Sequence, residues 1–73
     1  MKYRYIKEYG RSSVIFMNIV EDRDGELYLL KYCALEDKIW TSYADEKNKG
    51  YVPYTSATAV EEISEEDFFL EFI

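Results

Sequence analysis

The side chains that carry out most enzyme chemistry are almost absent from this sequence of 73 residues. The chain has no histidine, so it cannot form a Ser-His-Asp or Cys-His arrangement, and it lacks the usual acid/base group of neutral pH. Cys33 is the single cysteine, and one cysteine without histidine cannot make a structural tetrahedral zinc site. We therefore predict that the protein is not an enzyme and holds no zinc.

The glycine spacing predicts neither a nucleotide site nor a calcium site. Gly10, Gly25 and Gly50 are isolated from one another, so the chain has no P-loop and no dinucleotide fingerprint. If Gly25 is aligned with the required glycine of an EF-hand loop, Val20 falls at the first ligand position and Lys31 at the last. Neither is a calcium ligand, so we predict a solvated hairpin tip here, with no metal and no cofactor.

Acidic and aromatic side chains are the distinctive groups that remain. The chain has 15 Asp and Glu against 9 Lys and Arg, a formal net charge of −6, and eight tyrosines. This charge opposes contact with phosphates or anionic lipid, so we predict no direct nucleic-acid binding and no membrane association. Tyrosine buries a rigid ring at low rotamer cost and suits a protein interface, but it is equally typical of half-exposed strands.

The two ends of the chain carry opposite charge. No basic residue follows Lys49. The charged residues near the start are one acid and four basic residues: Glu8, Lys2, Arg4, Lys7 and Arg11. One interpretation is intramolecular, with a basic first strand beside an acidic tail, and the other is that the tail is a binding surface.

The first predicted strand covers residues 2–9. Tyr3, Tyr5 and Tyr9 fall on one face of this strand, with Lys7 in the same register. The other face carries polar residues and one isoleucine. This alternation is typical of a half-exposed strand.

Three further strands are predicted in antiparallel order. Segment 14–20 is apolar on both faces, so we expect it to be the best buried strand. Asp24-Gly25 is a strong turn signal, because glycine accepts positive φ, and predicts a hairpin into segment 27–34. Segment 39–44 is predicted as the fourth strand, with Trp40 on the face opposite to that of Ile39 and Tyr43.

The segment before the tail is predicted to be irregular. Residues 45–50 are polar and end in glycine, as a loop does, and Pro53 cannot donate to a strand ladder. We expect residues 51–54 to form an edge or an irregular crossing, and a fifth strand to cover 57–63.

A C-terminal helix is predicted from a capping signal. Ser64 stands immediately before three acids that favour the positive end of a helix dipole. Its apolar residues recur at i, i+4: Phe68 with Phe72, and Phe69 with Ile73. We predict one apolar stripe that closes the core, although three apolar residues among the last four also suit docking on a partner.

Together these elements predict an α+β fold, an antiparallel β-meander of four to five strands packed by one C-terminal α-helix. The length fits one small domain, 1–73, of modest stability. A single cysteine allows no internal disulfide, and the start "MKYRYIKEYG" has no continuous apolar stretch. We therefore expect a cytoplasmic protein, a setting that includes a virus-encoded product acting in a host cell.

Three stretches carry a resemblance to known proteins. The opening "MKYRYIKEYG", the turn "DGELY" and the closing "VEEISEED" resemble small, mostly uncharacterised acidic proteins of bacteria and phages with a short meander and a C-terminal helix. Proteins of this size and acidity include inhibitors of host or phage defence systems, some of which mimic nucleic acid with carboxylates. The resemblance implies a fold and a setting, and it supplies no functional residues.

We therefore predict a non-catalytic protein-binding module, in its most concrete form an inhibitor of a basic, nucleic-acid-handling protein. The acids would stand in for phosphates, and the tyrosines would supply contact area. The predicted partner-binding residues are Tyr3, Tyr5, Tyr9, Glu61, Glu62, Glu65, Glu66 and Asp67. The alternative is a structural homo-oligomer or small subunit that buries segment 14–20 and the terminal phenylalanines against a copy or a larger chain.

Overall fold

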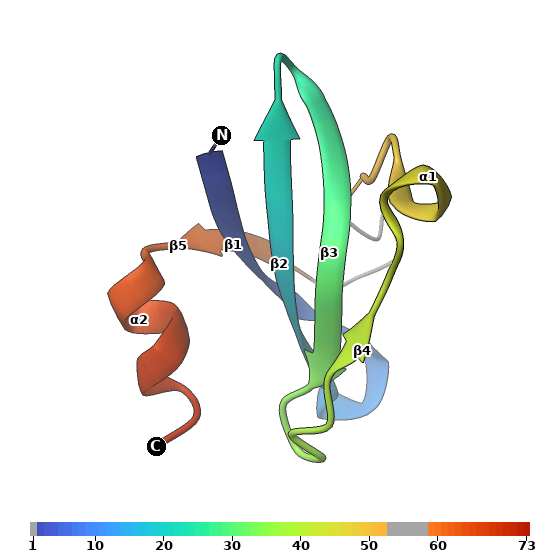
Figure 1. The fold of residues 1–73 in the computed structure, drawn as a ribbon. Coiled ribbons are helices and arrows are strands. Elements are labelled where there is room, and N and C mark those ends of the chain that lie inside the picture. The colour runs from blue at the N-terminus through green and yellow to red at the C-terminus, as the bar shows by residue number, and fades with distance from the viewer. Residues whose placement is uncertain (1, 53–58) are drawn as a thin grey trace.

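The computed structural model describes residues 2–52 and 59–73, which form a five-stranded antiparallel sheet with short helices (Figure 1). The strands are β1 (Lys2–Tyr9), β2 (Ile15–Arg23), β3 (Glu26–Ala34), β4 (Thr41–Ser42) and β5 (Ala59–Ile63). The helices are the 3-10 turn η1 (Arg11–Ser13), α1 (Asp45–Asn48) and α2 (Glu65–Leu70). The predicted α+β fold, an antiparallel sheet with a C-terminal helix, is confirmed. No helix in these ranges is long and apolar enough to cross a bilayer.

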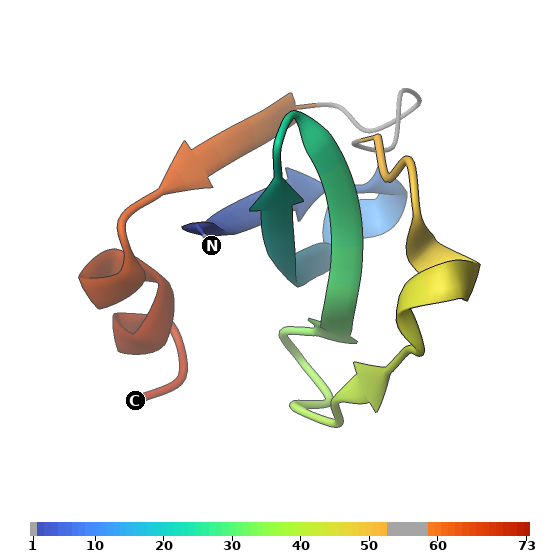
Figure 2. The same ribbon diagram turned by 45° about the horizontal axis from the view of Figure 1, so that its top comes forward.

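The strand order is β4-β3-β2-β1-β5. The first four strands follow one another as a meander, whereas β5 lies beside β1, at the edge opposite to β4 (Figure 2). The chain therefore crosses from one edge of the sheet to the other before β5 begins. This crossing brings the acidic end of the chain to its basic start. Pro53 and the first two residues of the predicted fifth strand lie outside the described residues.

Strand β2 occupies the centre of the sheet, as its apolar sequence predicts. Met17, Ile19 and Val20 are buried, and the strand pairs with β1 on one side and β3 on the other. The β2–β3 hairpin turns at Asp24 and Gly25, which both have positive φ, the geometry of a tight two-residue hairpin turn. The predicted hairpin is confirmed.

Helix α2 covers one face of this sheet. Phe68 and Met17 are fully buried and share one core cluster with Cys33. The ring of Phe68 lies 5.0 Å from that of Tyr5 and 6.0 Å from that of Trp40, between centroids. Burial raises the pKa of the Cys33 thiol.

The capping signal of α2 is confirmed, but its predicted apolar stripe is only half right. Asp67 donates its backbone N–H to Ser64 Oγ at 3.0 Å. Phe72 packs against the core beside Phe68, whereas Phe69 is 48% exposed and Ile73 is 96% exposed. Helix α2 ends at Leu70, so Phe72 and Ile73 follow the helix instead of continuing its i, i+4 spacing, and only Phe72 packs on the core.

Two further expectations are wrong in detail. The fourth strand is reduced to Thr41–Ser42, and the ring of Trp40 packs 6.0 Å from that of Phe68 in α2 and 5.3 Å from that of Phe72 beyond the helix. The predicted loop at 45–50 contains the single helical turn Asp45–Asn48. A single turn of helix has little propensity signal of its own, so this polar sequence did not predict the helix.

The burial of Phe68 predicts a large loss of stability on truncation. We expect Phe68→Ala to lower the free energy of unfolding by about 3–5 kcal/mol, or to leave the chain unfolded, because it empties the centre of the core. Phe69→Ala is the matched control, with an expected loss of about 1–2 kcal/mol from its contacts with Tyr5 and Phe68. Urea denaturation followed by circular dichroism measures both, and equal losses would show that Phe68 is not the central contact.

Candidate functional site

Strand β5 and helix α2 carry exposed acids and exposed apolar side chains. We call these residues the acidic tail surface: Glu61, Glu65, Glu66, Asp67, Phe69 and Leu70. All six are exposed, with Leu70 at 54%. On α2, the buried Phe68 occupies the inner side of the helix, and Glu61 lies on β5 opposite Lys7.

The acids of α2 have a local structural role as well. Glu65, Glu66 and Asp67 lie in the first turn of the helix, next to backbone N–H groups that carry partial positive charge. The last turn has no basic residue to balance them. The helix is therefore stabilised by the same carboxylates that make its surface acidic.

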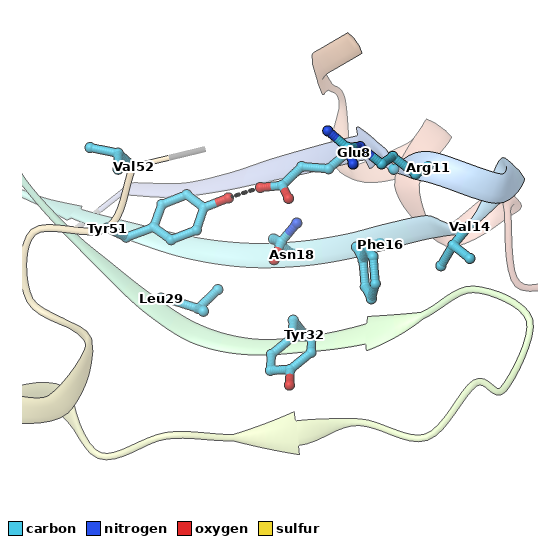
Figure 3. Close-up of a pocket in the computed structure, with 10 residues that line it drawn as sticks. Glu8, Arg11, Val14, Phe16, Asn18, Leu29, Tyr32, Tyr51 and Val52 are labelled. Carbon is cyan, nitrogen blue, oxygen red and sulfur yellow. Dashed lines mark hydrogen bonds between the residues drawn. The ribbon is translucent and has the colours of Figure 1, made fainter. Parts of the chain in front are cut away.

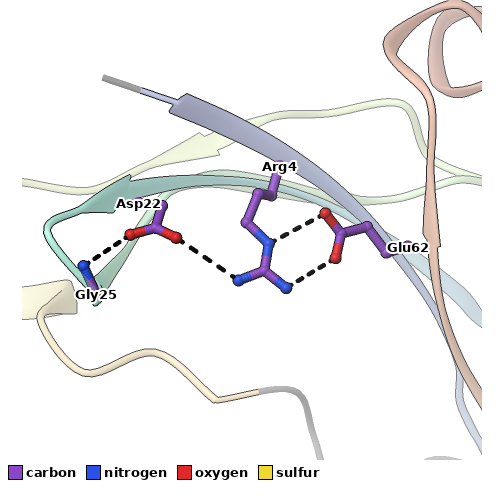
Figure 4. Close-up of polar contacts among 4 residues, drawn as sticks. All are labelled: Arg4, Asp22, Gly25 and Glu62. Atoms are coloured by element: carbon purple, nitrogen blue, oxygen red, sulfur yellow. Dashed lines mark hydrogen bonds and ion pairs between the residues drawn. The ribbon is translucent and has the colours of Figure 1, made fainter.

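Glu62 is held by an intramolecular ion pair with Arg4 of β1. The guanidinium donates from Nε to Oε2 at 3.0 Å and from Nη2 to Oε1 at 2.7 Å, a bidentate pair (Figure 4). Asp22 lies on the other side of Arg4, with 4.0 Å between Nη1 and Oδ2. The hydrogen bond from Arg4 lowers the pKa of Glu62 and raises that of Arg4. Glu62 thus ties β5 to β1.

A second ion pair ties α2 to β1. Lys7 Nζ lies 3.2 Å from Glu71 Oε1 and 5.1 Å from the centre of the Tyr9 ring. Its hydrogen bonding to Tyr9, together with that to Glu71, raises the pKa of Lys7. These contacts confirm the intramolecular interpretation of the charged ends for Glu62 and Glu71.

The three predicted tyrosines share one face of β1 but have different surroundings. Tyr5 packs its ring against Phe68 and Phe69, and burial, with the charge and hydrogen bond of Glu65, raises its pKa. Tyr9 lies beside Lys7. Tyr3 is exposed. Only Tyr3 therefore offers a largely open ring to a partner.

Four predicted acids have no cation of their own. In the part of the chain that the structure describes, Glu61, Glu65, Glu66 and Asp67 form no ion pair, and Glu65 instead bonds to the Tyr5 hydroxyl. Glu61 lies opposite Lys7 in the β1–β5 register, but Lys7 bonds to Glu71 instead. The carboxylates of Glu61, Glu66 and Asp67 remain available to cations from outside.

The exposed apolar part of the surface was not among the predicted site residues. Phe69 and Leu70 follow Phe68 directly in the sequence. Three consecutive apolar residues cover most of a helix circumference, so they cannot all face one sheet. That run was the signal for an outward apolar contact.

This surface offers carboxylate acceptors and apolar contact area, which suit basic groups of another molecule. Among residues 2–52 and 59–73, no group of three or more His, Cys, Asp and Glu side chains is placed to hold a metal ion. No protein-family model, curated protein or solved structure matches this chain. Its function has to be inferred from the geometry and charges of its own residues.

The Arg4–Glu62 pair predicts a small, pH-dependent coupling. Because both side chains are partly exposed, we expect a double-mutant cycle with Arg4→Gln and Glu62→Gln to give about 0.2–1 kcal/mol at pH 7. The lowered pKa of Glu62 means that this stability is present above its ordinary pKa of 4.5 and is lost as the pH falls through the lowered value. Urea unfolding between pH 7 and pH 3 measures the change.

Arg4→Gln with Glu61→Gln is the matched control, because Glu61 lies on the same strand without this partner. Its coupling should be close to zero at every pH. A coupling for Arg4 and Glu62 that stays constant down to the lowest pH would contradict the assignment.

Proposed function

We propose that this chain is a non-catalytic protein-binding module that binds a basic partner through the acidic tail surface. The observation that carries the proposal is the placement of Glu61, Glu66 and Asp67, which lack an intramolecular cation among the described residues. They stand beside the exposed Phe69 and Leu70, on a helix whose other side is fixed in the core.

The composition of the surface supports this role. Carboxylates steer a basic partner and set its orientation, whereas exposed apolar groups supply buried area once it has docked. The ring of Tyr5 packs against Phe69 of the acidic tail surface. A helix held by Phe68 and capped by Ser64 loses little freedom on binding, which reduces the entropic cost of association.

The specific form of the proposal is inhibition of a nucleic-acid-handling protein, such as a component of a host or phage defence system. The carboxylates of the acidic tail surface would occupy the positive groove where phosphates otherwise bind. The net charge of −6 and the resemblance of the opening, turn and closing stretches support this form. Glu62 contributes to the local negative field but is already bound to Arg4, so we place it outside the contact set.

Affinity capture from the native host tests the proposal. We expect the wild-type chain to retain a basic protein at about 0.05 M salt and to lose most of it near 1 M, because screening shortens the range of charge attraction. The variant Glu61→Gln/Glu65→Gln/Glu66→Gln/Asp67→Asn should capture at least tenfold less at low salt, a loss of about 1.4 kcal/mol or more. Mass spectrometry identifies and quantifies the captured protein.

A matched control separates position from total charge. The variant Asp24→Asn/Glu36→Gln/Asp37→Asn/Glu46→Gln removes four exposed acids elsewhere and should capture as well as the wild type. Circular dichroism verifies that both variants fold. If both variants captured equally less partner than the wild type, the effect would come from net charge alone, and this would contradict binding through the acidic tail surface.

A second candidate function is a structural homo-oligomer or small subunit. The exposed Phe69, Leu70 and Ile73 favour it, and β5 forms an edge of the described sheet that a second copy could extend. Strand β2, in contrast, has neighbours on both sides, and its Met17, Ile19 and Val20 are buried within the chain. For this candidate we therefore place the interface at β5 and the tail instead of at segment 14–20.

Light scattering distinguishes the two functions. The protein-binding proposal predicts the monomer mass of 8.7 kDa at both low and high salt. The structural alternative predicts a dimer that persists at high salt, because apolar association is not screened by ions. Leu70→Gln should dissociate such a dimer, and it should leave a monomeric wild type unchanged in mass.

A further inference from the structure

The outer side of β5 is an edge of the sheet that another strand can extend. In the described part of the chain, β5 pairs with β1 alone and lies at one edge of the sheet (Figure 2). Its first four residues are exposed, and the strand contains neither lysine nor proline, two residues that commonly protect a sheet edge. The opposite edge strand, β4, has only two residues. Strand β5 is therefore the edge that offers several residues to a partner.

The hydrogen-bond pattern of the sheet identifies the backbone groups on this edge. Gly10 donates its N–H to the backbone oxygen of Val14 at 2.7 Å, one step beyond the last β1–β2 pair. Hydrogen-bonded pairs alternate along an antiparallel ladder, so the even-numbered residues of β1 bond to β2 and the odd-numbered residues bond to β5. Val60 and Glu62 lie opposite even-numbered residues of β1. Their N–H and C=O groups therefore point away from β1, toward the outer edge.

The side chains of β5 alternate between the two faces of the sheet. Val60 shares the face of its partner Glu8, which is shown in Figure 3. Glu61 lies on the other face with its partner Lys7, which bonds to Glu71 just beyond α2. A strand added at this edge would therefore meet a carboxylate on the α2 side and an apolar side chain on the opposite side.

The charge of β5 favours one kind of added strand. The strand carries Glu61 and Glu62 and no basic residue. Like charges across a strand pair are destabilising and opposite charges are stabilising, so two copies of β5 would repel each other. Glu61 forms no ion pair among the described residues, and Glu65 and Glu66 follow shortly after the strand. An extended basic segment is the occupant that this edge favours.

We propose that the basic partner of the acidic tail surface adds an extended segment to the outer edge of β5, as an antiparallel strand. Antiparallel pairing is slightly more stable per residue, and it lets the backbone groups of Val60 and Glu62 bond to the added strand. The segment alternates basic and apolar residues, with a basic side chain beside Glu61 and apolar side chains beside Val60. This inference rests on the proposed function, because it specifies how the partner of that surface docks.

An NMR titration of the full chain with a synthetic peptide tests the inference. The probe is an acetylated and amidated heptapeptide of alternating lysine and valine, and the matched control peptide alternates glutamate and valine. We expect the lysine peptide to shift the amides of Val60 and Glu62 with a Kd in the millimolar range or tighter, and the glutamate peptide to leave them in place. The Hα of Glu61 should show a nuclear Overhauser effect to an Hα of the lysine peptide, because these atoms approach each other in an antiparallel pair. No shift, equal shifts with both peptides, or shifts in α2 without this Hα contact would overturn the inference.

Methylated peptides test the backbone hydrogen bonds without altering the protein. When a lysine lies beside Glu61, the valines lie opposite Val60 and Glu62, and the valine N–H groups face β5. Methylation of the valine backbone nitrogens should weaken binding about tenfold or more, because it removes these donors. Methylation of the lysine backbone nitrogens modifies the far edge of the peptide and should change the Kd by less than about threefold. Equal affinity of the two methylated peptides would overturn the addition of a strand.

Proline substitutions test the same edge in the protein. Val60→Pro removes an N–H that points outward, so the β1–β5 ladder keeps its bonds and only the added strand loses one. Ser42→Pro is the matched control at the opposite edge: Tyr43 donates its N–H to the Leu30 oxygen, so the neighbouring N–H of Ser42 points outward as well. We expect Val60→Pro to weaken the lysine peptide about fivefold or more and Ser42→Pro to bind it as the wild type does. Equal affinity of the two variants, both verified as folded by circular dichroism, would overturn the inference. The methylated peptides give the answer if Val60→Pro does not fold.

Affinity capture with Val60→Pro separates this inference from the proposed function. We expect the folded variant to capture less of the basic protein than Ser42→Pro does. Full capture by Val60→Pro, together with the loss in the variant that lacks the four acids of β5 and α2, would overturn strand addition and leave the acidic tail surface standing. Undiminished capture by that four-acid variant would overturn the proposed function itself.

Discussion

The pairing of β5 with β1 is the interaction on which the rest of the structure depends. It joins the chain's acidic end to its basic start, with Tyr5 opposite Ile63 and Lys7 opposite Glu61. Only Ser64 separates β5 from α2, so the register of this pair fixes where the helix begins. Phe68 is thereby placed over Met17 and Cys33, where it completes the core.

This pairing also divides the acids of the tail into two groups. Glu62 and Glu71 have basic partners on β1 and hold the tail to the sheet. Glu61, Glu66 and Asp67 have none among the described residues and face outward. One short helix can therefore close the core with one side and expose carboxylates on another, because its sides have different neighbours.

Local signals in the sequence predicted most of the individual elements, and non-local contacts account for what they missed. The Asp24-Gly25 turn and the Ser64 cap were recognised because each depends on a few adjacent residues. The opposite charges of the two ends indicated that the basic start could lie beside the acidic tail, but the pairing of β5 with β1 and its register were not predicted, because neither strand's pattern specifies its partner. The hydrogen bond from the Tyr51 hydroxyl to Glu8 was also missed, because the two residues are 43 positions apart and nothing near either one indicates the other.

Amide hydrogen exchange of the chain, with and without a captured partner, tests the proposed binding surface most directly. We expect slower exchange across β5 and α2, residues 59–70, and unchanged exchange at the tip of the β2–β3 hairpin on binding. Slower exchange confined to strands β2 and β3, with α2 unaffected, would contradict binding through the acidic tail surface. That result would leave the outward carboxylates of α2 with only their local role in stabilising the helix.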